Sequence, residues 1–582
     1  MSNIAADLEH SPAIPELVSV KRSDPVYMAH AYLTKVPVDA IVPFIEAFTV
    51  PGDTVLDPFA GSGMTGVAAA MTGRRGRLFD VSVLGRHIGT NYINLVNPDL
   101  LSKRAAEVLV QVERQTGDVY GVLCQRCGRR ATLVKTVWSM VVACGECERP
   151  VNFYEALEAA DWDKGRMVCS HCGAGITSKA RRVEEEPVGD WVACPCSPTQ
   201  AEQPWSPALV EIDPTGVEWP DLPIEPTRQM YLASALGRHG LTTTASFFSP
   251  RNLVVLGVLK REIDSVEERD LREKLLFAFT GILTRASKRY QWSRKRPLNA
   301  ANANYYVAPI FYEWNVFDLF ERKVKAALRA DDWFREARGA GTLFDIGPGI
   351  DVEYELASAD SLPLPDASVD YVFTDPPFGS NIFYSDMNLF YEAWLGETTD
   401  PAAEAVVDRV DTGMGRTVER YERLVTDALR ECRRVLKPGG VATIVFGNSS
   451  GAMWALLQRS IANAGFEVDP DLISVLDKGQ RSVKGLASGF ENVATLDLIL
   501  TLRPGPRSKV PETPAGLDAL DRAVDDLLTS NGSLTPSHLY VELLRTGLRS
   551  SWDLSSLDLS HVTERLRSAD RQVDRKTASI TD

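Results

Sequence analysis

The sequence predicts an α/β protein, a doubly wound and mainly parallel sheet into which further domains are inserted. Two segments, Thr54–Asp80 and Val369–Tyr384, have the pattern of buried parallel strands that end in glycine-rich or proline-rich loops. The chain between them is far longer than one crossover connection requires. Eight of the nine cysteines gather between Cys124 and Cys196. We therefore expect one sheet built from both parts of the chain, with separate folding units between them.

The bulk composition is that of an ordinary soluble protein, with 44% hydrophobic and 24% charged residues among 582. Such a length suits about three or four domains. No apolar run reaches the roughly 18 residues that a membrane span needs, and the first residues lack the basic and apolar regions of a signal peptide. The net charge of −15 argues against a coat of nucleic acid around the whole molecule, but it allows a local basic surface. We expect a cytoplasmic protein.

The first segment predicts a βαβ unit. An apolar strand, Thr54–Leu56, leads into the loop Asp57–Gly63, an alanine-rich helix and a second strand that ends at Asp80. Gly61 and Gly63 allow the backbone to approach a ligand closely, and an acid at the end of the second strand can accept ribose hydroxyls. The loop lacks the Lys-Ser/Thr end of a P-loop and the full glycine spacing of a dinucleotide site. The unit therefore favours a nucleoside cofactor without pyrophosphate.

The second segment predicts a buried strand with a rigid exit. Val369–Thr374 is apolar and β-branched, and the corner Asp375-Pro376-Pro377-Phe378 follows it directly. The prolines cannot continue the ladder, so they end the strand and stiffen the loop. Ligands of open α/β sheets bind at the carboxyl ends of strands. We therefore expect a site at this corner, with an ordinary turn as the competing interpretation.

Together, "LDPFAGSG" and "TDPPFG" resemble the cofactor and catalytic motifs of the amino-group (N6-adenine and N4-cytosine) DNA methyltransferases, which use S-adenosylmethionine. His30–Phe48 resembles the family's segment over the methionine end of the cofactor, and the segments after residue 350 resemble its Rossmann-like core of seven strands. The resemblance implies that Asp80 holds the ribose and that Lys35 lies near the methionine carboxylate. The implied cofactor-binding residues are Lys35, Asp57, Pro58, Phe59, Gly61, Gly63, Asp80 and Asp360.

The corner after the second strand suits the chemistry that this resemblance implies. An exocyclic amino group of a base is a poor nucleophile because its lone pair is delocalised into the ring. If Asp375 and the Pro376 carbonyl accept its two N–H groups, the lone pair is aimed at the methyl group, and this positioning supplies most of the acceleration. Phe378 offers a stacking face for an extruded base. The expected catalytic residues are Asp375, Pro376, Pro377 and Phe378, with a turn-forming Asp375 and a core Phe378 as the structural alternatives.

The cysteine-rich segment predicts two structural zinc sites. Its cysteines come in four pairs, Cys124/Cys127, Cys144/Cys147, Cys169/Cys172 and Cys194/Cys196. We expect consecutive pairs to combine, because two C-x-x-C pairs separated by 16 residues suit a four-cysteine zinc ribbon. The last pair departs from the pattern, with one residue between its cysteines, so His171 is an alternative ligand of the second site.

A basic and aromatic stretch follows in the part of the chain expected to be helical. No acidic residue occurs between Lys274 and Tyr312, while cations and aromatic residues alternate. Such a stretch suits contact with phosphates and bases, and a solvated charged face is the alternative. The expected nucleic-acid contacts are Arg285, Lys288, Arg289, Tyr290, Trp292, Arg294, Lys295 and Arg296.

These patterns divide the chain into a core and three further units. The core comprises residues 1–105 and 345–505; the others are a zinc-ribbon insert (118–200), a helical target-recognition insert (205–340) and a helical accessory domain (512–582). The favoured function is site-specific N6 methylation of a flipped adenine in double-stranded DNA by a cytoplasmic, nucleoid-associated enzyme. A restriction–modification or phage-defence system would supply partner subunits. The alternatives are N4-cytosine or RNA methylation, methylation of a protein glutamine amide, and a non-catalytic zinc-ribbon DNA-binding subunit.

Overall fold

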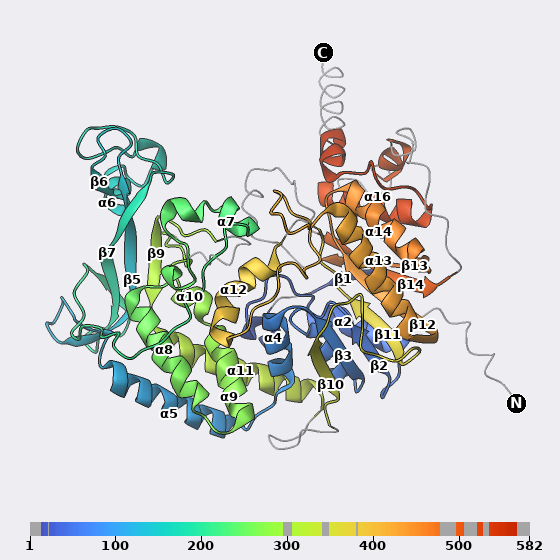
Figure 1. Ribbon diagram of the computed structural model, residues 1–582, viewed down its shortest axis with the longest axis horizontal. Helices are drawn as coiled ribbons and strands as arrows, with labels where there is room; N and C mark the ends of the chain where they lie inside the picture. Colours follow the sequence, from blue (N-terminus) through green and yellow to red (C-terminus); the bar gives the residue numbers. More distant parts are fainter. Residues whose placement is uncertain are drawn as a thin grey trace, which may run out of the picture.

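The computed structural model describes residues 13–20, 23–294, 305–339, 349–379, 382–477, 496–505, 521–527 and 535–566. Within these residues the chain is a mixed α/β protein with two β-sheets (Figure 1). The larger sheet collects strands from both parts of the chain, and the smaller one is formed by the middle of the chain. Among the described residues, no helix combines the length and the apolar character that crossing a bilayer requires.

The larger sheet has eight strands in the order β1-β13-β14-β12-β11-β2-β3-β10. Their bounds are β1 (Leu17–Ser19), β2 (Thr54–Asp57), β3 (Arg75–Asp80), β10 (Val352–Leu356), β11 (Val369–Thr374), β12 (Leu436–Phe446), β13 (Phe466–Asp477) and β14 (Leu496–Pro504). Neighbours are parallel except for β14, which runs antiparallel to β12 and β13. The sequence predicts seven strands; β1 is the eighth. The alternating pattern that ends at Pro504 predicts an edge strand, but β13 and β1 pair beyond β14, so this strand lies inside the sheet.

Helices cover both faces of this sheet, because its central strands are apolar on both sides. Val55, Tyr371 and Phe373 pack on one face against α2 (Val38–Phe48) and α3 (Met64–Met71). Leu56 and Val372 point to the opposite face, as the period of two along a strand requires. That second face is covered by α13 (Val418–Val435), α14 (Gly451–Asn463) and α16 (Pro536–Arg549).

The smaller sheet is built on a long antiparallel hairpin of β5 (Arg130–Ala143) and β7 (Arg182–Ala193). Its 14-residue strand β5 spans about 45 Å. The sheet is completed by β4 (Gly121–Leu123), β6 (Pro150–Asn152), β8 (Ala201–Gln203) and β9 (Ile310–Trp314). Since β9 comes from the helical part of the chain, the cysteine-rich and helical segments share one sheet.

A helical layer lies between the two sheets (Figure 1). Its members are α4 (Val83–Ile93), α5 (Pro98–Thr116), α8 (Pro250–Asp264), α9 (Arg269–Thr280) and α11 (Val316–Ala337). The Lys274 ammonium of α9 lies 2.8 Å from the Asp331 carboxylate of α11 and 2.7 Å from the Asn91 carbonyl of α4. This buried contact joins three helices of the layer. Further helices are α1 (Pro25–Ala29), α6 (Phe153–Ala159), α7 (Gln229–Ala233), α10 (Leu283–Ala286) and α12 (Tyr384–Leu395).

Candidate active site and metal centres

A pocket of about 1020 Å³ lies at the carboxyl ends of β2, β3, β10 and β11. Strands β2 and β11 are neighbours, with Val55 opposite Tyr371, so the loops that follow them meet. Gly61 of the first loop and Asp375 of the second both line the pocket. The structure thus brings the two distant segments into one site, at the edge of the sheet where open α/β folds bind ligands.

Asp57 stabilises this edge of the sheet through hydrogen bonds. One of its carboxylate oxygens accepts hydrogen bonds from the Thr374 hydroxyl (2.8 Å) and the Phe59 amide (3.1 Å), and the other from the Thr65 hydroxyl (2.6 Å). These bonds tie the end of β2 to the end of β11 and to the first turn of α3. Asp57 is 3% exposed, and burial raises its pKa to about 7. Its principal contacts are therefore within the protein.

Asp80 ends β3 and holds the glycine loop. Its carboxylate accepts hydrogen bonds from the backbone amides of Gly61 (2.8 Å) and Ser82 (2.9 Å), and burial raises its pKa. Gly63 has φ of +79°, and a Cβ on it would lie 2.6 Å from the Cα of Gly89 in α4. The glycine at position 63 is thus required by the packing of a helix against the loop. This is a different reason from the approach of a ligand that the sequence suggests.

Lys35, in the segment before α2, also lines the pocket. Its ammonium donates hydrogen bonds to the carbonyls of Tyr27 (2.5 Å) and His30 (2.6 Å), and lies 4.6 Å from the centre of the Tyr27 ring. Burial lowers the pKa of Lys35 to about 7. Of the residues expected to bind a cofactor, those that line the pocket are Lys35, Asp57, Pro58, Phe59, Gly61, Asp80 and Asp360.

The proline corner is only partly turned to the pocket. Asp375 and Pro377 belong to the lining, whereas Pro376 is buried and Phe378 packs elsewhere. The Phe378 ring is half-buried and lies edge-to-face with Phe446, with 5.2 Å between the ring centres. The expected stacking face of Phe378 is therefore directed to the core. This geometry agrees with the structural alternative, in which Phe378 is a core aromatic residue.

Two tyrosines that the sequence did not single out as an aromatic pair line the pocket instead. The rings of Tyr32 and Tyr384 are nearly parallel, with 6.0 Å between their centres and an angle of 25°. The Tyr384 hydroxyl also shares a hydrogen bond of 2.7 Å with the Thr34 hydroxyl. These rings come from segments that are remote in sequence, and neither segment carries a local signal that predicts the pairing.

Glu404 also lines the pocket, although no motif in the sequence marks this residue. It accepts hydrogen bonds from the Tyr384 amide (2.5 Å) and from the Ser385 hydroxyl (2.5 Å), so it caps the start of α12 from a distant loop. Glu404 is 4% exposed, and burial raises its pKa to about 7. Asp386 is turned away from the pocket and accepts hydrogen bonds from Arg228 (3.1 Å) and the Met230 amide (2.9 Å).

The eight paired cysteines form two groups, but not in the expected combination. One group is Cys124, Cys127, Cys194 and Cys196, and the other is Cys144, Cys147, Cys169 and Cys172. The expectation that consecutive pairs combine is wrong because β5 separates the first two pairs by the length of the hairpin. Each group lies at one end of that hairpin. The first group joins the turn before β5 to the turn after β7, and the second joins the turn after β5 to the turn before β7. His171 lies outside both groups, with Nε2 3.2 Å from the Pro150 carbonyl.

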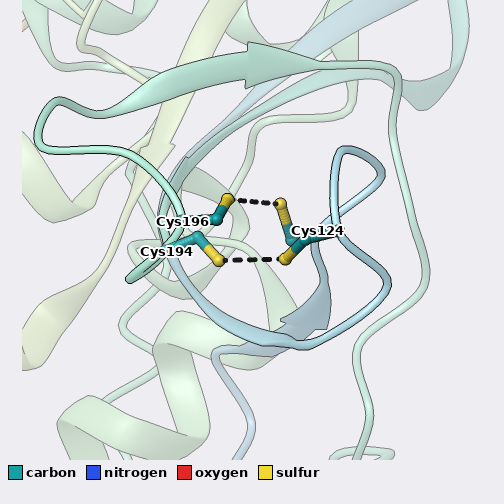
Figure 2. Close-up of side chains that lie close together, drawn as sticks. Cys124, Cys194 and Cys196 are labelled. Atoms are coloured by element: carbon teal, nitrogen blue, oxygen red, sulfur yellow. Dashed lines mark hydrogen bonds between the residues drawn. The ribbon is translucent and has the colours of Figure 1, made fainter.

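Both groups have the dimensions of a four-cysteine zinc site. Figure 2 shows Cys124, Cys194 and Cys196 of the first group converging, with sulfur–sulfur distances of 3.7 Å for Cys124–Cys196 and 3.6 Å for Cys127–Cys194. Four sulfurs placed tetrahedrally around zinc at about 2.3 Å lie about 3.8 Å apart. In each group all sulfurs are within 4.8 Å of one another. The cysteines of both groups therefore fit a tetrahedral ion.

Part of the basic stretch is buried, which corrects the expectation for these positions. Arg289 and Tyr290 are 2% and 6% exposed, and the Arg289 guanidinium lies 5.1 Å from the centre of the Phe390 ring. Lys288 forms an ion pair with Glu185 at 2.8 Å. These side chains fill the space between the helical layer and the smaller sheet, so a nucleic acid cannot reach Arg289 and Tyr290 in this structure.

The remainder of the stretch is more accessible. Arg285 and Arg294 are exposed, and the Arg294 guanidinium lies 4.9 Å from the centre of the Trp162 ring. Trp292 is half-buried and packs on the same tryptophan, with 5.2 Å between the ring centres. Trp162 belongs to the cysteine-rich segment, so the two inserted segments meet here. Two members of the predicted set lie outside the described residues, Lys295 and Arg296.

Comparison with known proteins points to one family for the first part of the chain. A family model described as DNA methylase matches residues 12–98. Over 42 residues the chain is 60% identical to "Putative methylase YubD" of Escherichia coli (strain K12), which is 7% of this chain and 18% of that protein. The solved structure of the [4+2]-cyclase SpnF matches 30% of this chain and 61% of its own, with 17% identity and a TM-score of 0.16.

The matched region is the one that builds half of the pocket. Residues 12–98 contain Lys35, the glycine loop and Asp80, whose positions around the pocket are described above. The match to YubD covers less than a fifth of that protein's length. The similarity to the N6/N4 DNA methylase family therefore lies in the segment that carries this half of the pocket.

Proposed function

We propose that the protein transfers a methyl group from S-adenosylmethionine to an exocyclic amino group of a base in DNA, with N6 of adenine as the favoured target. The observation that carries this proposal is a single pocket with two chemically different halves. Asp80 and Lys35 suit the polar ends of a nucleoside cofactor, and Asp375 suits an amino group. The first half includes the loops after β2 and β3, and the second half follows β11, which is the neighbour of β2.

The residues of the first half fit S-adenosylmethionine. Asp80 accepts two backbone N–H groups, and each carboxylate oxygen has a second lone pair that can accept a ribose hydroxyl. Lys35 offers a cation for the methionine carboxylate, and Asp57 and the glycine loop line the same pocket. When bound, the cofactor supplies an electrophilic methyl group.

In the second half, we assign the acceptor roles to the Asp375 carboxylate and the Pro376 carbonyl. Two acceptors on one amino group hold its nitrogen in line with the methyl group, which is the main requirement of this transfer. The Tyr32 and Tyr384 rings, and not Phe378, offer aromatic surface to the base in the pocket. Neither role needs a covalent nucleophile or a metal ion.

We propose that the inserted segments hold the DNA and that the cysteine groups hold structural zinc. Residues 1–105 and 345–505 form the catalytic domain, 118–200 the zinc-bearing insert, 205–340 the target-recognition insert and 512–582 the accessory domain. Within the described part of the basic stretch, Arg285 and Arg294 are exposed cations and candidates for phosphate contact. The physiological setting that we propose is DNA modification in a restriction or phage-defence system.

Expression in a methylation-free host followed by long-read DNA sequencing tests the proposal. We expect N6-methyladenine at a defined sequence for the wild type, no mark for Asp375→Ala, and an unchanged mark for the control Asp366→Ala, whose side chain is 79% exposed. Calorimetry should show that Asp375→Ala still binds S-adenosylmethionine, because the substitution lies in the other half of the pocket. An equal mark with Asp375→Ala would remove this residue from catalysis, and a mark on cytosine N4 would change the target.

A further inference from the structure

Two buried side chains hold the backbone of the proline corner. The Tyr421 hydroxyl, from α13, donates a hydrogen bond to the Pro377 carbonyl at 2.5 Å. The Asn448 amide, in the loop after β12, donates to the Phe378 carbonyl at 2.7 Å. Tyr421 and Asn448 are 1% and 7% exposed, and neither lines the pocket. They therefore reach the site only through the two backbone carbonyls.

The C-terminal helical region, residues 535–566, contacts the loop that carries Asn448. The Tyr540 hydroxyl of α16 donates to the Asn448 carbonyl at 3.2 Å, and the Leu559 amide donates to the Ser449 carbonyl at 3.0 Å. The Asp558 carboxylate accepts the Gly451 amide at 2.7 Å. Three hydrogen bonds from one region thus converge on the four residues 448–451.

The contact between this region and the start of α14 is also sterically close. A Cβ on Gly451, the first residue of α14, would lie 2.3 Å from the Leu554 carbonyl oxygen. The N-cap residue Ser450 provides no side-chain hydrogen bond, so the Asp558 carboxylate takes the capping role from outside the helix. The loop is therefore built to receive the C-terminal region at this place.

We propose that Tyr421 and Asn448 are positioning residues of the proline corner and that the C-terminal helical region, through Tyr540 and Asp558, fixes Asn448. The inference rests on the proposed function. Methyl transfer depends on alignment, and small displacements of an aligned group are costly in rate. The hydrogen-bond chain Tyr540–Asn448–Phe378 gives the C-terminal region a route to the site that it does not itself touch.

Variants that remove the hydrogen-bonding groups of these side chains test the proposal. Tyr421→Phe and the double variant Tyr540→Phe/Asp558→Ala are compared with Tyr120→Phe, a buried tyrosine whose hydroxyl bonds to Asn252 (2.7 Å) in the helical layer. We expect kcat for DNA methylation to fall about three- to tenfold in the first two, as the loss of one hydrogen bond in the transition state predicts. The dissociation constant of S-adenosylmethionine should stay within about twofold, and the control should keep its kcat.

Hydrogen exchange of the peptide 369–379 is measured on the same variants, because it reports on the corner without activity. Faster exchange in the first two variants, with an unchanged control, supports the proposal. The proposal would be overturned if Tyr421→Phe kept the kcat and the exchange rate of the wild type. It would also be overturned if kcat, cofactor affinity and thermal midpoint fell together, because that result indicates a general loss of stability. If the wild type methylates no DNA, the proposed function fails, and hydrogen exchange alone decides whether these residues hold the corner.

Discussion

Three acids around the pocket show how position decides the role of a carboxylate. The Asp57 carboxylate accepts hydrogen bonds from the Thr65 and Thr374 hydroxyls, and the Asp80 carboxylate accepts them from two backbone amides. The Glu404 carboxylate accepts a hydrogen bond from the backbone at the start of α12. The place of Asp80 at the end of a strand can be predicted from the sequence, because the strand pattern is local. The bond from Asp57 to Thr374 cannot, because the two residues are 317 positions apart, and no local pattern links Glu404 to the start of α12. The direction of Phe378 is likewise set by Phe446, on another strand.

The Glu404 carboxyl makes the stability of the protein depend on pH. Burial raises its pKa from 4.5 to about 7, so the folded state binds this proton more tightly than the unfolded state. The stabilisation is complete below about pH 4.5 and is lost as the pH rises through 7, by about 2–3 kcal/mol. We expect the thermal midpoint of Glu404→Gln, relative to the wild type, to rise between pH 5 and pH 8.

The control for this measurement is Glu353→Gln, whose side chain is 60% exposed. Its difference from the wild type should change far less over the same pH range, because this side chain remains in contact with water in the folded protein. An equally small change for Glu404→Gln would show that the folded protein does not hold this proton.

At the scale of the element, the cysteine hairpin shows where sequence spacing is ambiguous. The 16 residues between the first two cysteine pairs suit a compact ribbon loop, but they also suit one long strand. Strand β5 takes most of that length, and β7 returns beside it. The identity of all eight cysteines can therefore be predicted, whereas their combination depends on a strand pairing that no local pattern reveals.

Zinc content distinguishes the two combinations. We expect two zinc ions per chain in the wild type, measured by elemental analysis of the purified protein. The double variant Cys127→Ser/Cys194→Ser changes one group and should retain one ion. Cys127→Ser/Cys147→Ser changes both groups and should retain none. The reverse result would restore the combination of consecutive pairs.

At the scale of the molecule, buried charged side chains join the inserted helices to one another and to the core. Lys274 and Asp331 are 1% and 2% exposed at a separation of 2.8 Å, and Arg228 contacts the fully buried Asp386 at 3.1 Å. A sheet drawn from both parts of the chain can be predicted from two strand-and-loop patterns. The contribution of β9 to the cysteine sheet and of β1 to the large sheet cannot, because short strands acquire their pairing from neighbours that are remote in sequence.

Removal of one partner from a buried pair tests how firmly the inserted helices are fastened. Lys274→Met leaves the Asp331 carboxylate buried without its cation, and should destabilise the protein by about 3–5 kcal/mol. The double variant Lys274→Met/Asp331→Leu should recover much of this loss. Thermal unfolding is the measurement, with Lys260→Met as the control, because its pair with Asp264 is exposed and worth less than about 1 kcal/mol. Equal losses in the single and double variants would argue against a charge effect.

The hydrogen bond between Asp57 and Thr374 joins residues that are 317 positions apart. At a translation rate of about 5–20 residues per second, the ribosome needs on the order of 16–60 s to supply the second partner. During that interval the nascent glycine loop emerges without the strand that will lie beside it. The pocket therefore cannot form until Thr374 has been synthesised, so the nascent chain lacks this pocket until translation has passed well beyond the middle of the sequence.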